Sequence, residues 1–76
     1  MTVADIVVDE LARTCALASE QVRREATLIE VGLDSVRGIN FLIALETQFE
    51  IELPDDAIVT ASTVEDVIRI VEDRLS

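Results

Sequence analysis

The chain has 76 residues, half of them hydrophobic, and its 16 acidic residues against six arginines give a formal net charge of −10. We expect one small domain over residues 1–76, without room for a catalytic cleft beside a substrate domain. Nucleic acid is a poor partner for this acidic chain, because affinity for phosphate backbones comes from lysine and arginine. No apolar run approaches the roughly 18 residues of a membrane span, and no signal peptide is evident, so we expect no membrane association and a cytoplasmic protein.

The first predicted element is a helix from Thr2 to about Ala16. Its apolar residues recur at three- and four-residue steps, and Thr2 or Asp5 can cap its start. Cys15 is expected to be a small core residue; as the only cysteine it excludes an intramolecular disulfide, which is consistent with a reducing compartment. The expected inward stripe consists of Val3, Ile6, Val7, Leu11 and Cys15.

Residues 17–34 follow no helical period and are interpreted as a long connecting loop. Val22, Leu28 and, as a third candidate, Ile29 are expected to pin this loop to the core. Loops of this length are uncommon in compact domains and usually have a functional reason. Here the loop would carry the chain back along the first helix and deliver Ser35 at its far end.

The second helix is predicted from Ser35 to about Glu50 and is apolar on more than one face. One apolar stripe is assigned to the core. A second stripe is rotated away from the first and runs back to Ser35, so that it is either buried by the small bundle or exposed to a partner. The core stripe consists of Phe41, Leu42, Leu45 and Phe49, and the second stripe of Val36, Ile39 and Ile43.

The rest of the chain predicts two further helices. Pro54 fits the first turn of a short helix from Asp55 to about Thr60, with Ala57 and Ile58 inward. The segment 62–65 has a capping-box pattern, so the last helix is expected to begin there and to run to about Leu75. No strand alternation is present, and the predicted fold class is all-α, with three main helices plus one short helix. The inward stripe of the last helix consists of Val64, Val67, Ile68, Val71 and Leu75.

The candidate site is the stretch Gly32-Leu33-Asp34-Ser35. Glycine frees the backbone to turn, aspartate can cap a helix, and the serine stands in the first turn, where unpaired N–H groups and the macrodipole favour a negative group esterified to its hydroxyl. Taken alone, Asp-Ser before an apolar run is also a common way to start a helix. A serine hydrolase is set aside, because the chain has no histidine or lysine to activate the hydroxyl and Asp34 is a poor base for it. Ser35 is therefore interpreted as a place where something is attached.

Further landmarks follow this stretch: Ala44-Leu45-Glu46 with Phe49, then Leu53-Pro54-Asp55, then Thr63-Val64. With them, nearly the whole chain resembles the acyl/peptidyl carrier protein family. The resemblance implies a four-helix carrier-protein bundle with a long loop between helices 1 and 2, and a 4′-phosphopantetheine arm on Ser35, installed from coenzyme A by a separate phosphopantetheinyl transferase. The arm would hold an acyl or aminoacyl group as a thioester, and the chain itself would be no enzyme. Asp34 would serve in recognition and capping, and Gly32 and Leu33 would shape the turn.

The other partners that the resemblance implies are an acyl- or aminoacyl-loading ligase and downstream transferases, and we expect a monomer. Fatty-acid-synthesis carriers usually have acids in the first turns of the second helix, where this chain has Arg37 and Asn40, which favours a dedicated carrier in a specialised pathway. Arg37 is also the only basic residue between Glu25 and Asp66, so the acidic excess surrounds the site and favours basic partner surfaces; the alternative is that the acids only keep a small protein in solution. The expected partner-binding residues are Val36, Arg37, Ile39, Asn40 and Ile43.

Two other classes of function compete with a carrier. One is a small acidic helical adapter that is never modified and binds a basic protein through its second helix. The other is a metal site built from Glu50, Glu52, Asp55 and Asp56. Calcium takes six to eight oxygens from a shaped loop, and neither EF-hand spacing nor a loop glycine is present. We therefore expect no specific metal site.

Overall fold

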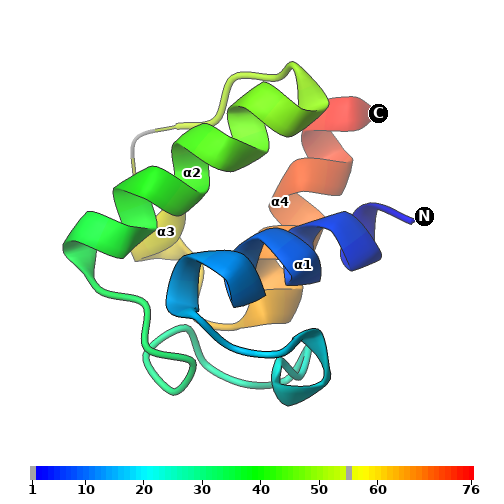
Figure 1. Cartoon of the computed structure of the whole chain (residues 1–76). Helices are drawn as coiled ribbons and strands as arrows, with labels where there is room; N and C mark the ends of the chain where they lie inside the picture. The colour runs from blue at the N-terminus through cyan, green and yellow to red at the C-terminus, as the bar shows by residue number, and fades with distance from the viewer. Residues whose placement is uncertain (1, 55) are drawn as a thin grey trace.

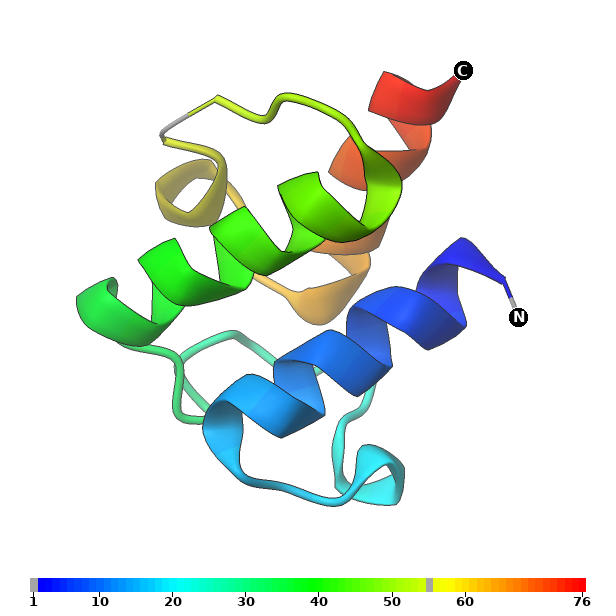
Figure 2. The ribbon, with the colours of Figure 1, turned by 45° about the horizontal axis from the view of Figure 1, so that its top comes forward.

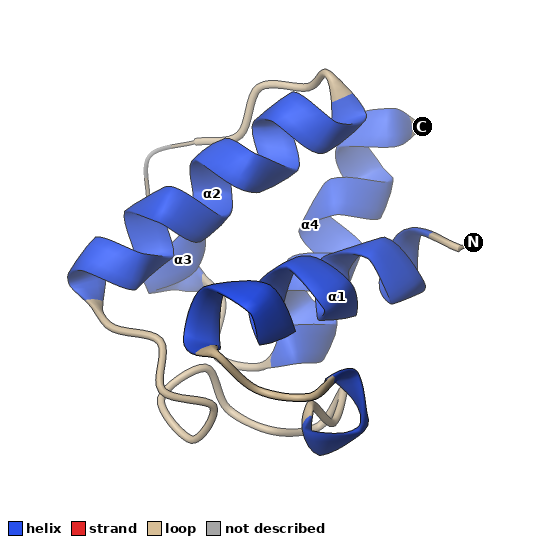
Figure 3. Ribbon diagram, viewed as in Figure 1, coloured by secondary structure: helices blue, strands red, loops and turns tan. Residues whose placement is uncertain are grey.

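The computed structural model describes residues 2–54 and 56–76, except for the side chain of Ile58. The elements, in chain order, are α1 (Val3–Cys15), the 3₁₀ turn η1 (Ser19–Gln21), α2 (Ser35–Phe49), α3 (Ala57–Thr60) and α4 (Val64–Leu75). The described residues form no strand (Figure 3), and their extended pairing is limited to one isolated bridge between Thr27 and Thr63. This arrangement confirms the predicted all-α fold of three main helices plus one short helix.

Helix α1 begins at a complete capping box. The Asp5 amide donates to Thr2 Oγ1 over 3.1 Å, and the Thr2 amide donates to Asp5 Oδ2 over 3.2 Å, so both residues named as alternative caps act together. The helix ends where Ala16 adopts a left-handed conformation with φ 58°. Its buried residues are Val7, Leu11, Ala12 and Cys15, while Val3 and Ile6, which were predicted to point inward, are only partly buried.

The core lies between α1, α2 and α4. Figures 1 and 2 show α1 and α2 side by side and running in roughly opposite directions, with α4 behind them; α1 packs against both, and α3 packs against α2 and α4. Only two aromatic residues are present, and the interior is correspondingly aliphatic around Phe41. The largest fully buried side chains are Phe41, Leu11, Leu45, Ile68, Val7, Val64 and Val71.

The loop between α1 and α2 is anchored by apolar side chains. Val22 and Leu28 are buried, as predicted, and so is Val31, which the sequence pattern did not single out. The prediction of Ile29 as a third anchor was wrong, because its side chain is 85% exposed. The turn around it is closed by hydrogen bonds from the Gly32 amide to the Ile29 carbonyl and from the Leu33 amide to the Leu28 carbonyl, both 3.0 Å. Within this turn Leu28 and Leu33 face the core, and Ile29 faces outward.

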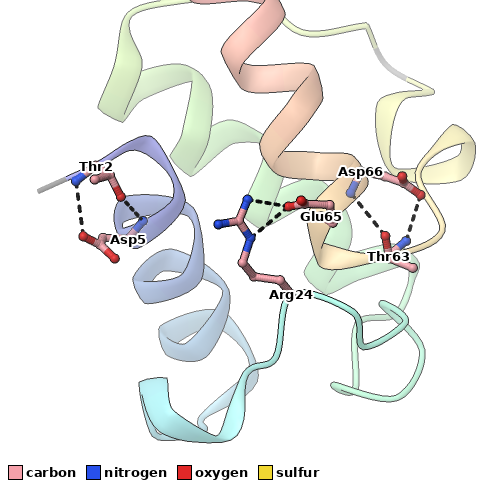
Figure 4. A network of polar contacts seen from close by, with 6 residues as sticks. All are labelled: Thr2, Asp5, Arg24, Thr63, Glu65 and Asp66. Carbon is pink, nitrogen blue, oxygen red and sulfur yellow. Dashed lines mark hydrogen bonds and ion pairs between the residues drawn. The ribbon is translucent and has the colours of Figure 1, made fainter.

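The same loop is fastened to the start of α4. The Leu28 amide donates to the Ser62 carbonyl over 3.0 Å, and the Glu65 amide donates to the Arg24 carbonyl over 2.8 Å. The Arg24 guanidinium also pairs with Glu65, with Nη2 2.6 Å from Oε2 (Figure 4). A loop of this length is therefore held in one place, although it has almost no regular structure of its own.

The predicted start of the last helix was one residue early. The capping box consists of Thr63 and Asp66 (Figure 4), not of Ser62 and Glu65, because the Asp66 amide donates to Thr63 Oγ1 and the Thr63 amide to Asp66 Oδ2, both over 3.2 Å. The Ser62 amide donates to the same carboxylate oxygen over 3.0 Å. The backbone hydrogen bonds from Ser62 and Thr63 lower the pKa of Asp66. Glu65 is thereby free to pair with the loop.

Three smaller predictions on helix ends and inward residues are corrected or limited. Helix α2 ends at Phe49, because Glu50 takes a left-handed conformation with φ 55°. Helix α3 is shorter than predicted and begins at Ala57, which is buried as expected; Asp55 and the side chain of Ile58 lie outside the described parts. Leu75, assigned to the inward stripe of the last helix, is 44% exposed, because it lies at the very end of α4, past the core.

Candidate functional site

The turn that leads into α2 depends on Gly32 and Leu33. Gly32 has φ +91°, in the region that L side chains rarely adopt, so glycine is required there. Leu33 is buried, and its amide closes the turn onto Leu28. Gly32 permits the turn and Leu33 fixes it to the core. Together they set the position of Asp34 and Ser35, in agreement with the expectation that these two residues shape the turn.

Asp34 caps α2. Its Oδ1 accepts from the Arg37 amide over 2.8 Å, and its carbonyl accepts from the Gly38 amide over 2.7 Å. The carboxylate is therefore used by the helix backbone, which argues against its acting as a base for a neighbouring hydroxyl. Removal of such a capping oxygen typically costs about 1 kcal/mol.

Ser35 is the first residue of α2 and is exposed. The amides of Ser35 and Val36 lie too early in the helix to have an acceptor within it, and the positive end of the macrodipole lies beside them. A phosphate ester on the Ser35 hydroxyl would therefore stand where the backbone favours a negative charge. The exposed hydroxyl, the fixed turn and the electropositive helix end fit the attachment of a phosphate-linked group.

Arg37 bends back across the turn. Its Nη1 donates to the Gly32 carbonyl over 3.3 Å, so its side chain braces the turn. The positive charge of Arg37 also acts on Cys15, but burial has the larger effect and raises the pKa of this thiol above its ordinary value. Cys15 is therefore a neutral, buried residue of the core at neutral pH, as the sequence predicted.

The second apolar stripe of α2 faces away from the core. Val36, Ile39 and Ile43 are 67%, 60% and 54% exposed, which excludes burial of this stripe by the bundle. Asn40, on the same face, is also exposed. Of the stripe assigned to the core, Phe41, Leu42 and Leu45 are buried and Phe49 is partly buried.

This outward face of α2 carries no acid, although the chain has 16 acidic residues. The one acidic residue in α2 is Glu46, and its Oε2 accepts from the Leu53 amide over 2.9 Å. The acidic excess expected around the site is therefore not on this face of α2. A partner that contacts the middle of this face meets aliphatic and neutral side chains.

A surface groove opens at Ser35. The space has a volume of about 600 Å³. It is lined by residues of the loop before α2, by the start of α2 and by the segment between α3 and α4: Thr27, Leu28, Ile29, Leu33, Asp34, Ser35, Val59, Ala61 and Ser62. Ile29 and Val59 belong to this lining and are 85% and 86% exposed. From the sequence, Ile29 was a candidate anchor of the loop, and Val59 had no predicted role. The missed signal was an isoleucine placed inside a tight turn in which Leu28 and Val31 already supply the core contacts.

No group of three or more His, Cys, Asp or Glu side chains suited to a metal ion occurs among the described residues. Of the four acids considered for such a site, Asp55 lies outside that part of the chain. No helix that the structure describes is both long and apolar enough to cross a membrane.

Comparisons with known proteins identify the family. Residues 5–71 match the family model described as "Phosphopantetheine attachment site". The acyl carrier protein of Phenylobacterium zucineum is 37% identical over 57 residues, which cover 74% of this chain and 72% of that protein. The acyl carrier protein of Wolinella succinogenes is 32% identical over 73 residues, which cover 95% and 96% of the two chains.

Solved structures share the fold. The mupirocin didomain ACP superposes with a TM-score of 0.84 at 23% identity, over 97% of this chain and 40% of that one. The A-PCP didomain of carboxylic acid reductase from Segniliparus rugosus, solved in complex with AMP, gives a TM-score of 0.85 at 24% identity, over 96% of this chain and 10% of that one. The chain thus belongs to the phosphopantetheine-attachment family of carrier proteins, whose members carry a covalent 4′-phosphopantetheine arm and catalyse no reaction themselves.

Proposed function

We propose that Ser35 is the attachment residue of the 4′-phosphopantetheine arm, and that residues 1–76 act as a single carrier domain that holds an acyl or aminoacyl group as a thioester on the arm. The observation that carries this proposal is the position of Ser35: an exposed hydroxyl on the first residue of α2, directly after the capping Asp34 and inside the segment that matches the family. When bound, the arm supplies the thiol that holds the cargo.

The surrounding residues have positioning roles in this proposal. Asp34 fixes the first turn of α2 through the Arg37 amide, and Gly32 and Leu33 fix the turn before it. The helix end favours the single negative charge of a phosphodiester on Ser35. These residues hold the hydroxyl in solvent, where the active site of a separate phosphopantetheinyl transferase can reach it.

The partner surface in this proposal is the outward face of α2. Val36, Ile39 and Ile43 expose aliphatic area beside Ser35, with Asn40 among them and Arg37 at the flank. Exposed apolar patches that the core does not use typically mark interaction sites. The transferase, a loading ligase and downstream transferases would take turns on this face, in the cytoplasm, where coenzyme A is available.

The test is intact-protein mass spectrometry after incubation with coenzyme A, magnesium and a broad-specificity phosphopantetheinyl transferase. The wild-type chain is expected to gain the mass of one phosphopantetheine, and Ser35→Ala none. Ser62→Ala is the matched control, because Ser62 is also an exposed serine close to a helix start; it should load like the wild type. Absence of any gain with several transferases would refute the proposal and favour the unmodified adapter, for which Ser35 is only part of a helix start.

A further inference from the structure

Arg37 forms two hydrogen bonds to the turn that leads into α2. Its amide donates to Asp34 Oδ1 over 2.8 Å, and its side-chain Nη1 donates to the Gly32 carbonyl over 3.3 Å. A Cβ placed on Gly32 would lie 3.8 Å from the same Nη1, so the guanidinium rests directly against this residue. Arg37 therefore holds the residues on both sides of Leu33.

The peptide unit between Gly32 and Leu33 is held at both of its polar ends. Its N–H, on Leu33, donates to the Leu28 carbonyl over 3.0 Å, and its carbonyl, on Gly32, accepts from Arg37. In the described part of the chain, Arg37 is the only donor to that carbonyl. Gly32 has φ +91° and no side chain to restrict its rotation. Without the guanidinium, the carbonyl end of a peptide two residues before Ser35 would be free to rotate.

The charge of Arg37 is also used within the chain. None of the ion pairs among the described residues involves Arg37. Burial raises the pKa of Cys15 and the charge of Arg37 opposes this effect, so the guanidinium lies near the last residue of α1. The carbonyl end of a helix favours a cation. The guanidinium thus lies between a helix end and a backbone carbonyl, and both favour a positive charge.

Resting on the attachment of the arm to Ser35, we propose that Arg37 is a positioning residue of the loading reaction. It clamps the turn so that the Ser35 hydroxyl is presented in the geometry that the phosphopantetheinyl transferase accepts. The Ser35 oxygen attacks the phosphorus that bears pantetheine in coenzyme A, the pyrophosphate P–O bond breaks, the adenosine bisphosphate leaves, and the hydroxyl proton is released to solvent. Arg37 acts on this step only through the Gly32–Leu33 peptide.

The clamp keeps the turn in its loading conformation before the transferase binds. If its loss leaves about one-third of the molecules in that conformation, the KM for the chain rises about threefold and kcat is unchanged. A residue that serves only the stability of the fold would instead lower the Tm and leave KM as it is. The ratio of KM values between variant and wild type therefore measures the clamp.

The experiment measures loading from coenzyme A by two unrelated broad-specificity transferases, at low and at high salt. Arg37→Gln removes the guanidinium and keeps the amide that bonds to Asp34. It should raise KM about threefold with both transferases and at both salt concentrations, with kcat unchanged. Arg13→Gln is the matched control, because it makes the same change of charge at an exposed arginine of α1 that pairs with Glu10 of its own helix. This control should load like the wild type.

Amide hydrogen exchange, measured by NMR on the unmodified chain, tests the clamp without any transferase. In Arg37→Gln the Leu33 amide should exchange faster than in the wild type, because the turn opens more often. The Leu45 amide should be unchanged, since Arg37 is exposed and its replacement leaves the core intact. Arg37→Lys keeps the charge on a shorter stem without the planar fork, so that KM and the Leu33 exchange should recover only in part.

Three results would overturn the proposal. A KM increase that disappears at high salt would assign Arg37 to a charge contact with the transferase. Full recovery of KM in Arg37→Lys, while its Leu33 amide still exchanges fast, would mean that loading follows the charge and not the turn. An unchanged Leu33 amide in Arg37→Gln would mean that the turn does not depend on the guanidinium. Failure of the wild type to load at all would instead overturn the attachment to Ser35.

Discussion

Two substitutions separate the hydrogen bond that Asp34 accepts from the charge that it places at the start of α2. Asp34→Ala removes the oxygen that accepts from the Arg37 amide over 2.8 Å and leaves that amide without its cap. The expected cost is about 1 kcal/mol in the free energy of unfolding, which for a chain of this size lowers the Tm by about 4–8 °C. Asp34→Asn keeps an acceptor oxygen and loses only the charge at the helix end, which is worth about 0.3–1 kcal/mol at low ionic strength and less in salt.

The assay is thermal unfolding followed by circular dichroism, at low and at moderate salt, in parallel with loading by the transferase. Asp34→Ala should melt below the wild type at both salt concentrations, whereas Asp34→Asn should approach the wild type as salt is added. If the alanine and asparagine variants melt together, the capping argument is wrong. If both melt as predicted but load at the wild-type rate, Asp34 supports the helix and has no part in recognition by the transferase.

Four further outcomes follow from the described contacts. Leu45→Ala should lower the free energy of unfolding by about 2–5 kcal/mol because the side chain of Leu45 is fully buried. Ile43→Ala on the exposed face should change it by less than about 0.5 kcal/mol. The midpoints of urea unfolding measure both changes. Hydrogen bonds from Ser62 and Thr63 depress the pKa of folded Asp66, so their contribution to stability is present above the unfolded pKa of about 4 and is lost as the pH falls through the folded value. Asp66→Asn should reduce the loss of unfolding free energy between neutral and acidic pH. An unchanged dependence of the unfolding free energy on pH would contradict this prediction. The Tm of the wild type should rise on adding about 0.1 M NaCl, because salt screens the self-repulsion of a net charge of −10. At this concentration the Debye length of about 10 Å is comparable to the radius of gyration of 10.8 Å. A Tm that does not change with salt would count against this prediction. A double-mutant cycle on Arg24 and Glu65 should give a coupling of about 0.2–1 kcal/mol, since the guanidinium is half exposed. Zero coupling would mean that this ion pair does not help to fasten the loop to α4.

The helices were predictable from the sequence because their signals are local. The period of apolar residues placed α1, α2 and α4 to within about two residues, and the Thr2–Asp5 box marks the start of α1. At α4 the local signal was ambiguous, because Ser62 and Thr63 can both cap a helix and each is followed three residues later by an acid. The second position won because the first, Ser62, is drawn into the backbone pairing with Leu28.

The loop and the groove were not predictable in the same way. Which of Leu28, Ile29, Val31 and Leu33 faces the core depends on how the turn is oriented against the rest of the fold. The turn closes through local hydrogen bonds, but it is held in place by the bond from the Leu28 amide to the carbonyl of Ser62, a residue more than thirty positions later in the chain. The fate of the second α2 stripe likewise depends on where the other helices pack. The motif at Ser35 was recognisable in the sequence, but its surroundings depend on tertiary contacts.

The core-facing residues and the outward-facing residues of α2 lie on different sides of the helix. Phe41, Leu42 and Leu45 point into the core, whereas Val36, Ile39 and Ile43 contribute little to it. Substitutions on the outward face therefore change what the helix presents to another molecule at almost no cost in folding. Under the proposal that partner enzymes bind this face, substitutions there would change which enzymes the chain serves, and the face can be randomised as a library without first stabilising the fold.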